Sequence, residues 1–172
     1  MVESVGGAAR GVKKVGQRRL TRRSDRSVLV DDKVITTKIK KGFFDSVIPA
    51  LGLSVFCHQG LVVLAGVIAD PQIGDKAVAV ARAVEGVKRV ETYFLPGQPA
   101  PLQDLQITLK IKAKIIGDGA LRVSQVDMAV IAGHAVLTGV VDRPEKIDQI
   151  MRHARAVEGV VAVKSFLQLQ AR

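Results

Sequence analysis

Apolar residues recur along this chain with two different spacings, and each change of spacing marks the boundary of a predicted element. Ile35, Ile39 and Phe43 lie four residues apart with lysines between them, a pattern typical of one face of a helix. Residues 61–67 (LVVLAGV) are almost all apolar, which indicates a buried strand. Between residues 31 and 95 these spacings predict the order helix, strand, strand, helix, strand.

Capping and turn residues predict where these elements begin and end. The first helix is expected to begin at Asp31-Asp32, which are good N-cap residues, and to end near Gly42. Strands are predicted at 51–57 and 61–67, a hairpin turn at 58–60, a second helix from Asp70-Pro71, and a third strand at 87–94. The first module therefore contains a hairpin between two helices and closes with a strand.

The same plan returns later in the chain. The heptapeptide ARAVEGV stands at 81–87 and again, letter for letter, at 154–160, and aligned glycines and prolines flank both copies. Such self-similarity indicates a tandem duplication. In each copy the glycine of the heptapeptide, Gly86 or Gly159, is expected to end the second helix as a C-cap with positive φ.

The second copy completes the predicted fold. It contains a helix that is capped by Asp104 and ends at 117–119, strands at 122–132 and 135–141, a helix from Pro144, and a last strand at 160–169. A right-handed crossover places the last strand of each module parallel to a hairpin strand. The expected fold class is α+β, with two tandem αββαβ modules, each a three-stranded mixed sheet covered on one face by two helices. The modules span 31–95 and 104–172, and a proline-rich linker spans 96–103.

Residues 1–30 have a different composition from the rest of the chain. They hold eight basic residues against two acidic ones, in a chain of net charge +10, and they show no apolar periodicity. We interpret them as a flexible basic arm, in which Arg18, Arg19, Arg22 and Arg23 contact a polyanion. The alternative is a solvated tail with no binding role. No apolar run of a secretory signal follows these charges, and no lipobox cysteine is present.

The residues that usually carry catalysis are sparse and scattered. The histidines, His58, His134 and His153, have no partner at metal or triad spacing, and no paired carboxylates form an acid–base site. Cys57 is the single cysteine, so an intrachain disulfide is excluded, and we interpret it as a small core residue. No apolar run is long enough to span a bilayer. We expect no enzyme activity, no metal and no cofactor.

Short motifs at the ends of the predicted elements resemble those of BON domains. The hairpin ends in Leu-x-Gly-x, as LAGV at 64–67 and LTGV at 137–140, and the second helix is followed by VEGV at 84–87 and at 157–160. The opening helix, VITTKIK at 34–40, is similar to the family's as well. The resemblance covers residues 31 to 170. It is strongest to the dual-BON proteins of the Gram-negative envelope, of the outer-membrane lipoprotein and the periplasmic osmotic-stress types.

This resemblance implies binding to anionic phospholipid and support of envelope integrity. The lipid-facing element of the lipoprotein type corresponds to the helix 106–116, with Lys110, Lys112 and Lys114 as headgroup contacts. Where lipid-inserting members carry an aromatic residue, this chain has Gln106, which favours headgroup electrostatics over insertion. The expected location is the periplasm or the outer membrane if a signal precedes the given sequence, and the cytoplasm otherwise.

Three alternatives stay open at this point. The lysines of helix 106–116 could simply solvate an amphipathic helix. Paired BON domains could act as a scaffold that binds envelope proteins. Nucleic acid is the third candidate because the chain has a pI near 10.1, but aromatic residues amount to only 3% and leave no platform on which bases could stack. The sequence therefore disfavours nucleic acid as the partner.

Overall fold

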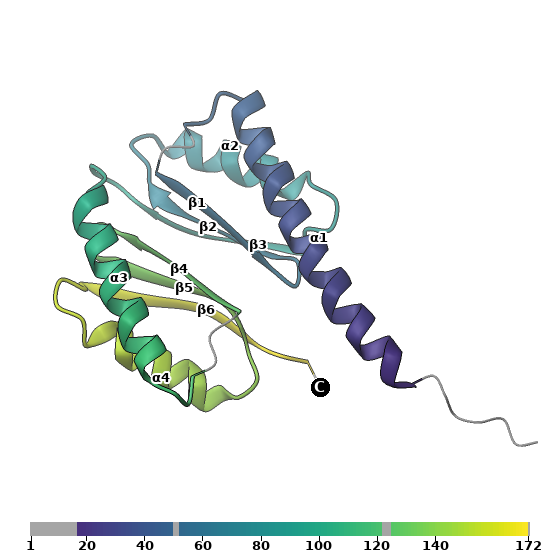
Figure 1. Cartoon of the computed structure of the whole chain (residues 1–172). Helices are drawn as coiled ribbons and strands as arrows, with labels where there is room; N and C mark the ends of the chain where they lie inside the picture. The colour runs from purple at the N-terminus through teal and green to yellow at the C-terminus, as the bar shows by residue number, and fades with distance from the viewer. Residues whose placement is uncertain (1–16, 50–51, 122–124, 172) are drawn as a thin grey trace, which may run out of the picture.

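The computed structural model describes residues 17–49, 52–121 and 125–171, with the backbone alone for 17–30. These residues form two modules with the same order of elements (Figure 1). The first module consists of α1 (Gln17–Asp45), β1 (Leu53–His58), β2 (Leu61–Val67), α2 (Pro71–Arg82) and β3 (Arg89–Leu95). The second consists of α3 (Pro101–Gly117), β4 (Val126–Ile131), β5 (His134–Val141), α4 (Pro144–Arg155) and β6 (Ala162–Leu169).

The second strand of each hairpin forms the centre of its sheet. β2 pairs antiparallel with β1 and parallel with β3, and β5 pairs in the same way with β4 and β6. Val62 lies opposite Val90 in the first sheet, and the corresponding pair in the second sheet is Ala135 and Val163. The predicted fold class of two mixed three-stranded sheets is confirmed.

One face of each sheet is covered by the two helices of its own module. In the first module Ile39 and Phe43 of α1 and Ala81 of α2 pack on Val62 and Leu64 of β2. In the second module the corresponding core is formed by Ile107, Ile111, Ile115, Leu137, Ile150 and Ala154. The apolar faces that the helical spacing indicated are therefore the faces that pack on the sheets.

The other faces of the two sheets pack against each other, so that the molecule has four layers: helices, sheet, sheet, helices (Figure 1). Leu61, Val63 and Ala65 of β2 share an apolar cluster with Ile131 and Val136 of the second module. Because β2 is buried on both faces, its side chains are apolar at successive positions instead of alternating with polar ones.

The first helix begins earlier than predicted. α1 starts at Gln17, so the backbone of residues 17–30 continues the helix instead of forming a flexible segment. Arginine is a good helix former, and the absence of apolar periodicity does not prevent a helix that projects from the body (Figure 1). Arg18, Arg19, Arg22 and Arg23 therefore lie on helical backbone, although their side chains and residues 1–16 lie outside the described part.

Two aspartates that were expected to cap helices stabilise the hairpin turns instead. The carboxylate of Asp32 accepts hydrogen bonds from the backbone N–H groups of Gln59 at 2.7 Å and Gly60 at 3.0 Å. Asp104 accepts the equivalent bonds from Ala132 at 2.9 Å and Gly133 at 3.0 Å. These turn residues all have positive φ, which leaves their N–H groups pointing away from the strand ladder. Each carboxylate thus ties its first helix to its hairpin.

The glycines of the repeated heptapeptide have the predicted positive φ, 93° at Gly86 and 92° at Gly159, but they are not helix C-caps. The C-cap residues are Ala83 and Ala156, both in right-handed helical conformation. Each glycine lies in a separate turn, closed in the first module by a hydrogen bond from Val87 N to Val84 O at 3.2 Å. This extra turn explains why β3 and β6 begin about two residues later than predicted.

Other boundaries also shift. Pro101 is already the first residue of α3, since proline is tolerated in a first helical turn, so the linker is shorter than predicted. β4 begins at Val126, after a turn at Gln125, whereas the predicted strand was to begin at 122. Residues 122–124, where this strand was expected to start, lie outside the described residues.

Candidate functional site

The helix α3 holds the predicted site residues, and its inner face fixes its orientation. Ile107, Ile111 and Ile115 are buried against the second sheet, and the carboxylate of Asp104 binds the hairpin turn. Thr108 also donates its hydroxyl to the carbonyl oxygen of Asp104 at 2.7 Å. Because these contacts lie on one side of the helix, the opposite side faces solvent.

The solvent side of α3 carries an apolar stripe that the sequence analysis missed. Leu102, Leu105, Leu109 and Ile116 are spaced by three, four and seven residues and lie on one line along the helix. Their side chains are between 54% and 77% exposed, and the small Ala113, also exposed, lies between the last two. The spacing was visible in the sequence. It was hidden because the isoleucine face satisfied the amphipathic pattern by itself.

The predicted contact residues flank this apolar stripe. Lys110 and Lys114 lie on one side of it together with Gln106, and Lys112 lies on the other side. All four are exposed, and within the described part of the chain none of the three lysines forms an ion pair. The structure therefore brings the four residues to one surface, with exposed leucines between them.

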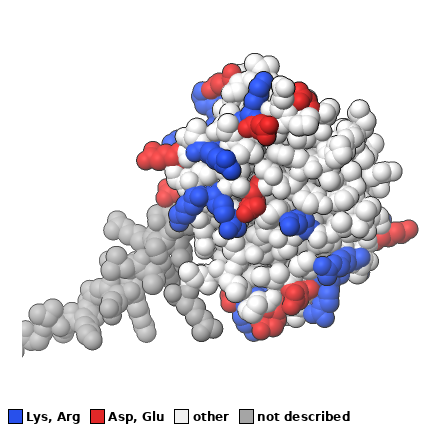
Figure 2. All heavy atoms as spheres, turned by 180° about the vertical axis from the view of Figure 1, so that it is seen from behind, with Lys and Arg blue, Asp and Glu red and all other residues white. Residues whose placement is uncertain are grey.

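The charge distribution elsewhere is mixed. Figure 2 shows basic and acidic side chains interspersed around a broad uncharged area on the face of the molecule opposite to the view of Figure 1. Several basic residues of the molecule have acidic neighbours, as Lys146 has Asp142 at 2.7 Å and Arg89 has Glu91 at 3.1 Å. Lys110 and Lys114 differ from these residues in that neither forms an ion pair within the described part of the chain, whereas the charge of Lys112 helps to lower the pKa of Asp127.

Each histidine has a partner that is distant in the sequence. His153 Nε2 lies 2.8 Å from Asp118 Oδ2, and this contact holds the pKa of Asp118 below its usual value. His134 Nδ1 lies 2.7 Å from the hydroxyl of Tyr93 in the other module. The third, His58, faces the carboxylate of Asp127 in the second module. The partners lie in different places, and the described residues contain no cluster of three or more His, Cys, Asp or Glu side chains that could hold a metal ion.

Cys57 is a buried thiol in the core of the first module. Burial, together with the nearby carboxylate of Asp32, raises the pKa of the thiol to about 12. The Sγ atom lies 3.1 Å from Asp32 Oδ1, to which it donates a hydrogen bond. A thiol that stays protonated is a poor nucleophile and a poor metal ligand, which agrees with its interpretation as a core residue.

The described helices include none that is both long and apolar enough to cross a bilayer.

Comparison with known proteins identifies the family. The BON domain model matches residues 31–94 and 103–171, which is most of the chain. The chain belongs to the BON-domain family. The osmotically-inducible protein Y of Escherichia coli (strain K12) is 31% identical over 146 residues, covering 81% of this chain and 73% of that protein. An uncharacterised protein of Anaplasma centrale, encoded in the gshII 5′ region, is 25% identical over 146 residues, covering 82% of this chain and 96% of its own length.

A solved structure shows a remote likeness. The C-terminal domain of CdsD, a structural protein of the type III secretion system of Chlamydia trachomatis, has 17% sequence identity and a TM-score of 0.35. The match covers 81% of this chain and 67% of that chain.

Proposed function

We propose that this protein is a non-catalytic binding protein of the cell envelope that attaches to anionic phospholipid surfaces through α3. The observation that carries the proposal is the exposed stripe of Leu102, Leu105, Leu109 and Ile116, flanked by unpaired lysines on both sides. Membership of the BON-domain family and the likeness to an osmotically inducible protein support an envelope role.

The arrangement suits the interface of a bilayer. An amphipathic helix lies in the plane of the membrane when its apolar face enters the boundary between headgroups and acyl chains and its basic residues stay among the headgroups. Each lysine close to an anionic surface adds about 1 kcal/mol of attraction. Gln106 lies beside the apolar stripe and not within it, so a polar residue at this position does not interrupt the leucines. Shallow insertion of leucines therefore adds to the headgroup attraction expected from the lysines alone.

Charge reversal of two lysines tests this proposal. In Lys110→Glu with Lys114→Glu, sedimentation with phosphatidylglycerol vesicles at about 0.1 M salt, where exposed charges still interact over roughly 10 Å, should fall to the level seen with phosphatidylcholine vesicles. The melting temperature should barely change, because both side chains are exposed and repel each other at i, i+4.

The matched control is Lys38→Glu with Lys41→Glu in α1, which makes the same charge change on the corresponding helix and should reduce binding less. If the α3 variant sediments as wild type does, the lipid site lies elsewhere. If wild type itself ignores phosphatidylglycerol vesicles, the proposal fails and a protein scaffold becomes the better hypothesis.

A further inference from the structure

The duplication creates two cavities between the modules, and each is lined by the first helix and first strand of one module and by the hairpin of the other. The first, which we call the polar cavity, has a volume of about 780 Å³ and includes Lys33, His58 and Asp127 in its walls. The second, which we call the apolar cavity, has a volume of about 310 Å³ and includes Leu105, Ile131 and Ser54 at the corresponding places. One cavity therefore serves as an internal reference for the other.

At five equivalent positions of the two cavities the side chains differ in polarity. The pairs, with the polar cavity first, are Lys33 and Leu105, Cys57 and Val130, His58 and Ile131, Gln125 and Gly52, and Asp127 and Ser54. In each pair the more polar or more strongly charged group belongs to the polar cavity. If both cavities served only to pack the two sheets together, apolar residues would be favoured in each of them, because burying a polar group without a partner is unfavourable. The polar residues of the first cavity are therefore not explained by packing alone.

The His58–Asp127 pair crosses between the modules at one wall of the polar cavity. His58 Nε2 lies 3.1 Å from Asp127 Oδ2, close enough for an ion pair but without hydrogen-bond geometry. The Asp127 side chain is 60% exposed, so the cavity is open to solvent at this wall. The backbone carbonyl oxygen of His58 accepts a hydrogen bond at 3.1 Å from Gln168 Nε2, which holds this wall to β6.

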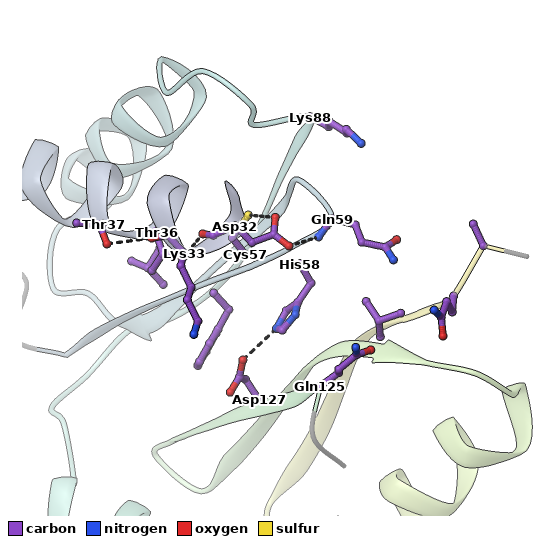
Figure 3. Close-up of a pocket in the computed structure, with 15 residues that line it drawn as sticks. Asp32, Lys33, Thr36, Thr37, Cys57, His58, Gln59, Lys88, Gln125 and Asp127 are labelled. Atoms are coloured by element: carbon purple, nitrogen blue, oxygen red, sulfur yellow. Dashed lines mark hydrogen bonds and ion pairs between the residues drawn. The ribbon is translucent and has the colours of Figure 1, made fainter. Parts of the chain in front are cut away.

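The polar cavity is lined by two carboxylates and two lysines, and of these four groups only the lysines lack a polar partner among the described residues. The carboxylate of Asp32 is already bonded to two backbone N–H groups and a thiol, and Asp127 faces His58. Among the side chains that the structure describes, the ammonium groups of Lys33 and Lys88 form no ion pair. Figure 3 shows Lys33 extending from α1 toward the His58–Asp127 pair, with Gln125 opposite and Lys88 at the far rim.

We propose that the polar cavity binds a small soluble phosphate monoester. The ammonium group of Lys33, which forms no ion pair, favours a ligand that carries close to two negative charges at neutral pH, and Lys88 at the far rim adds a second positive charge to the cavity. The amide of Gln125 can donate to further oxygens, and Phe56 in the lining is an apolar surface for the carbon skeleton. The volume lies within the roughly 300 to 1,000 Å³ of small-molecule sites, whereas the apolar cavity is at the lower limit and lacks the cations.

The test uses the full chain and glycerol 3-phosphate as the probe, with binding measured by isothermal titration calorimetry. Wild type should bind one molecule saturably. In Lys33→Leu, which installs the residue of the apolar cavity, Kd should rise at least tenfold, a change typical of losing a charge-assisted contact. The matched control is Leu105→Lys, which makes the reverse change in the apolar cavity and should leave Kd unchanged. Melting curves check that both variants are folded.

Two further measurements separate this site from α3. Lys33→Leu should sediment with phosphatidylglycerol vesicles as wild type does, and Lys110→Glu with Lys114→Glu should keep its affinity for glycerol 3-phosphate. The proposal is overturned if wild type shows no saturable binding of the probe or if Lys33→Leu binds it equally well. If Lys33→Leu lowers vesicle sedimentation and wild type does not bind the free probe, the phosphate belongs to a lipid headgroup, and the soluble ligand is ruled out.

Discussion

Helices α1 and α3 occupy the same place in their modules, and their inner faces use the same chemistry. Ile35 and Ile39 pack on the first sheet as Ile107 and Ile111 pack on the second. Outside the inner faces the corresponding residues differ at three exposed positions: Lys33 and Leu105, Thr37 and Leu109, and Lys41 and Ala113. Of these residues, Lys33, Thr37 and Leu105 also line the cavities between the modules. In each of these pairs α1 has the polar residue and α3 the apolar one, whereas the last position of the stripe is apolar and exposed in both helices, as Phe44 in α1 and Ile116 in α3.

This difference indicates that the two modules divide their tasks. The inner faces have kept the residues that the core needs, since a lost methylene group in a close-packed interior is destabilising. The outer faces are free of that constraint. An exposed line of leucines has no purpose for the stability of a monomer, whereas a lysine and a threonine at the same positions are ordinary surface residues. Under the proposed function, α3 turns its apolar stripe toward a membrane, and α1, which lacks most of that stripe, faces water.

The largest expected effect comes from converting one outer face into the other. Leu105→Lys with Leu109→Thr and Ala113→Lys gives α3 the outer residues of α1 while leaving its buried isoleucines untouched. We expect sedimentation with phosphatidylglycerol vesicles to fall at least tenfold although two positive charges are added, because the leucines that enter the interface are lost. Binding that rises with the added charge would show that electrostatics alone attach the protein.

The reverse conversion sharpens the same comparison. Lys33→Leu with Thr37→Leu and Lys41→Ala gives α1 the apolar stripe, and Lys38 and Lys40 remain beside it as Lys110 and Lys112 do in α3. This variant is the matched control for insertion by leucines. It should bind phosphatidylglycerol vesicles better than wild type, and an unchanged affinity would mean that the position of α3 matters as well as its residues.

A smaller effect is expected at the two equivalent glycines. Gly86 and Gly159 share a positive φ, and a Cβ atom built on them would lie 2.9 Å from Ile35 Cδ1 and 3.1 Å from Ile107 Cδ1. Gly86→Val and Gly159→Val should each cost about 1–3 kcal/mol in the free energy of unfolding, from backbone strain, and Gly86→Val slightly more because its contact is closer. Urea denaturation measures this cost, and an unchanged midpoint in either variant would contradict the assigned turn.

Much of this fold could be predicted from the sequence because its signals are local or repeated. The spacing of Ile35, Ile39 and Phe43 identified the buried face of α1, and the repeated heptapeptide identified the second copy. The roles of Asp32 and Asp104 could not be predicted in this way. A carboxylate near the start of a helix resembles an N-cap, and its true partners are turn residues about 28 positions away.

Of the two candidate sites, the surface of α3 could be predicted from the sequence and the polar cavity could not. The lysines of α3 were predicted because they alternate with the isoleucine face, and the leucine stripe was available in the same segment. The polar cavity was not predictable, because it exists only where two sheets pack face to face. His58 and Asp127 belong to different modules, and no spacing within either module connects them.

The smallest expected effect is a pH dependence of the free energy of unfolding that comes from Asp127 in the polar cavity and has no counterpart in the apolar cavity. The contact with His58 holds the pKa of Asp127 below its usual value, so the folded state binds the proton less readily than the unfolded chain does. The resulting stabilisation is fully present above the unfolded pKa, near 3.9, and is lost as pH falls through the lower folded value. Because the side chain is largely exposed, the gain is only a few tenths of a kcal/mol.

Asp127→Asn should therefore be slightly less stable than wild type in urea at pH 7. The difference should begin to shrink below about pH 4, near the usual carboxyl pKa, and should close only below the lower folded pKa of Asp127. The apolar cavity provides the control, because Ser54 stands at the equivalent position and does not titrate there. Ser54→Asn places the same amide in that cavity and should shift stability by a constant amount between pH 7 and pH 3. A pH-independent cost for Asp127→Asn would show that His58 and Asp127 contact each other without an ionic contribution. In that case the packing of the two modules against each other would not depend on an ion pair in either cavity.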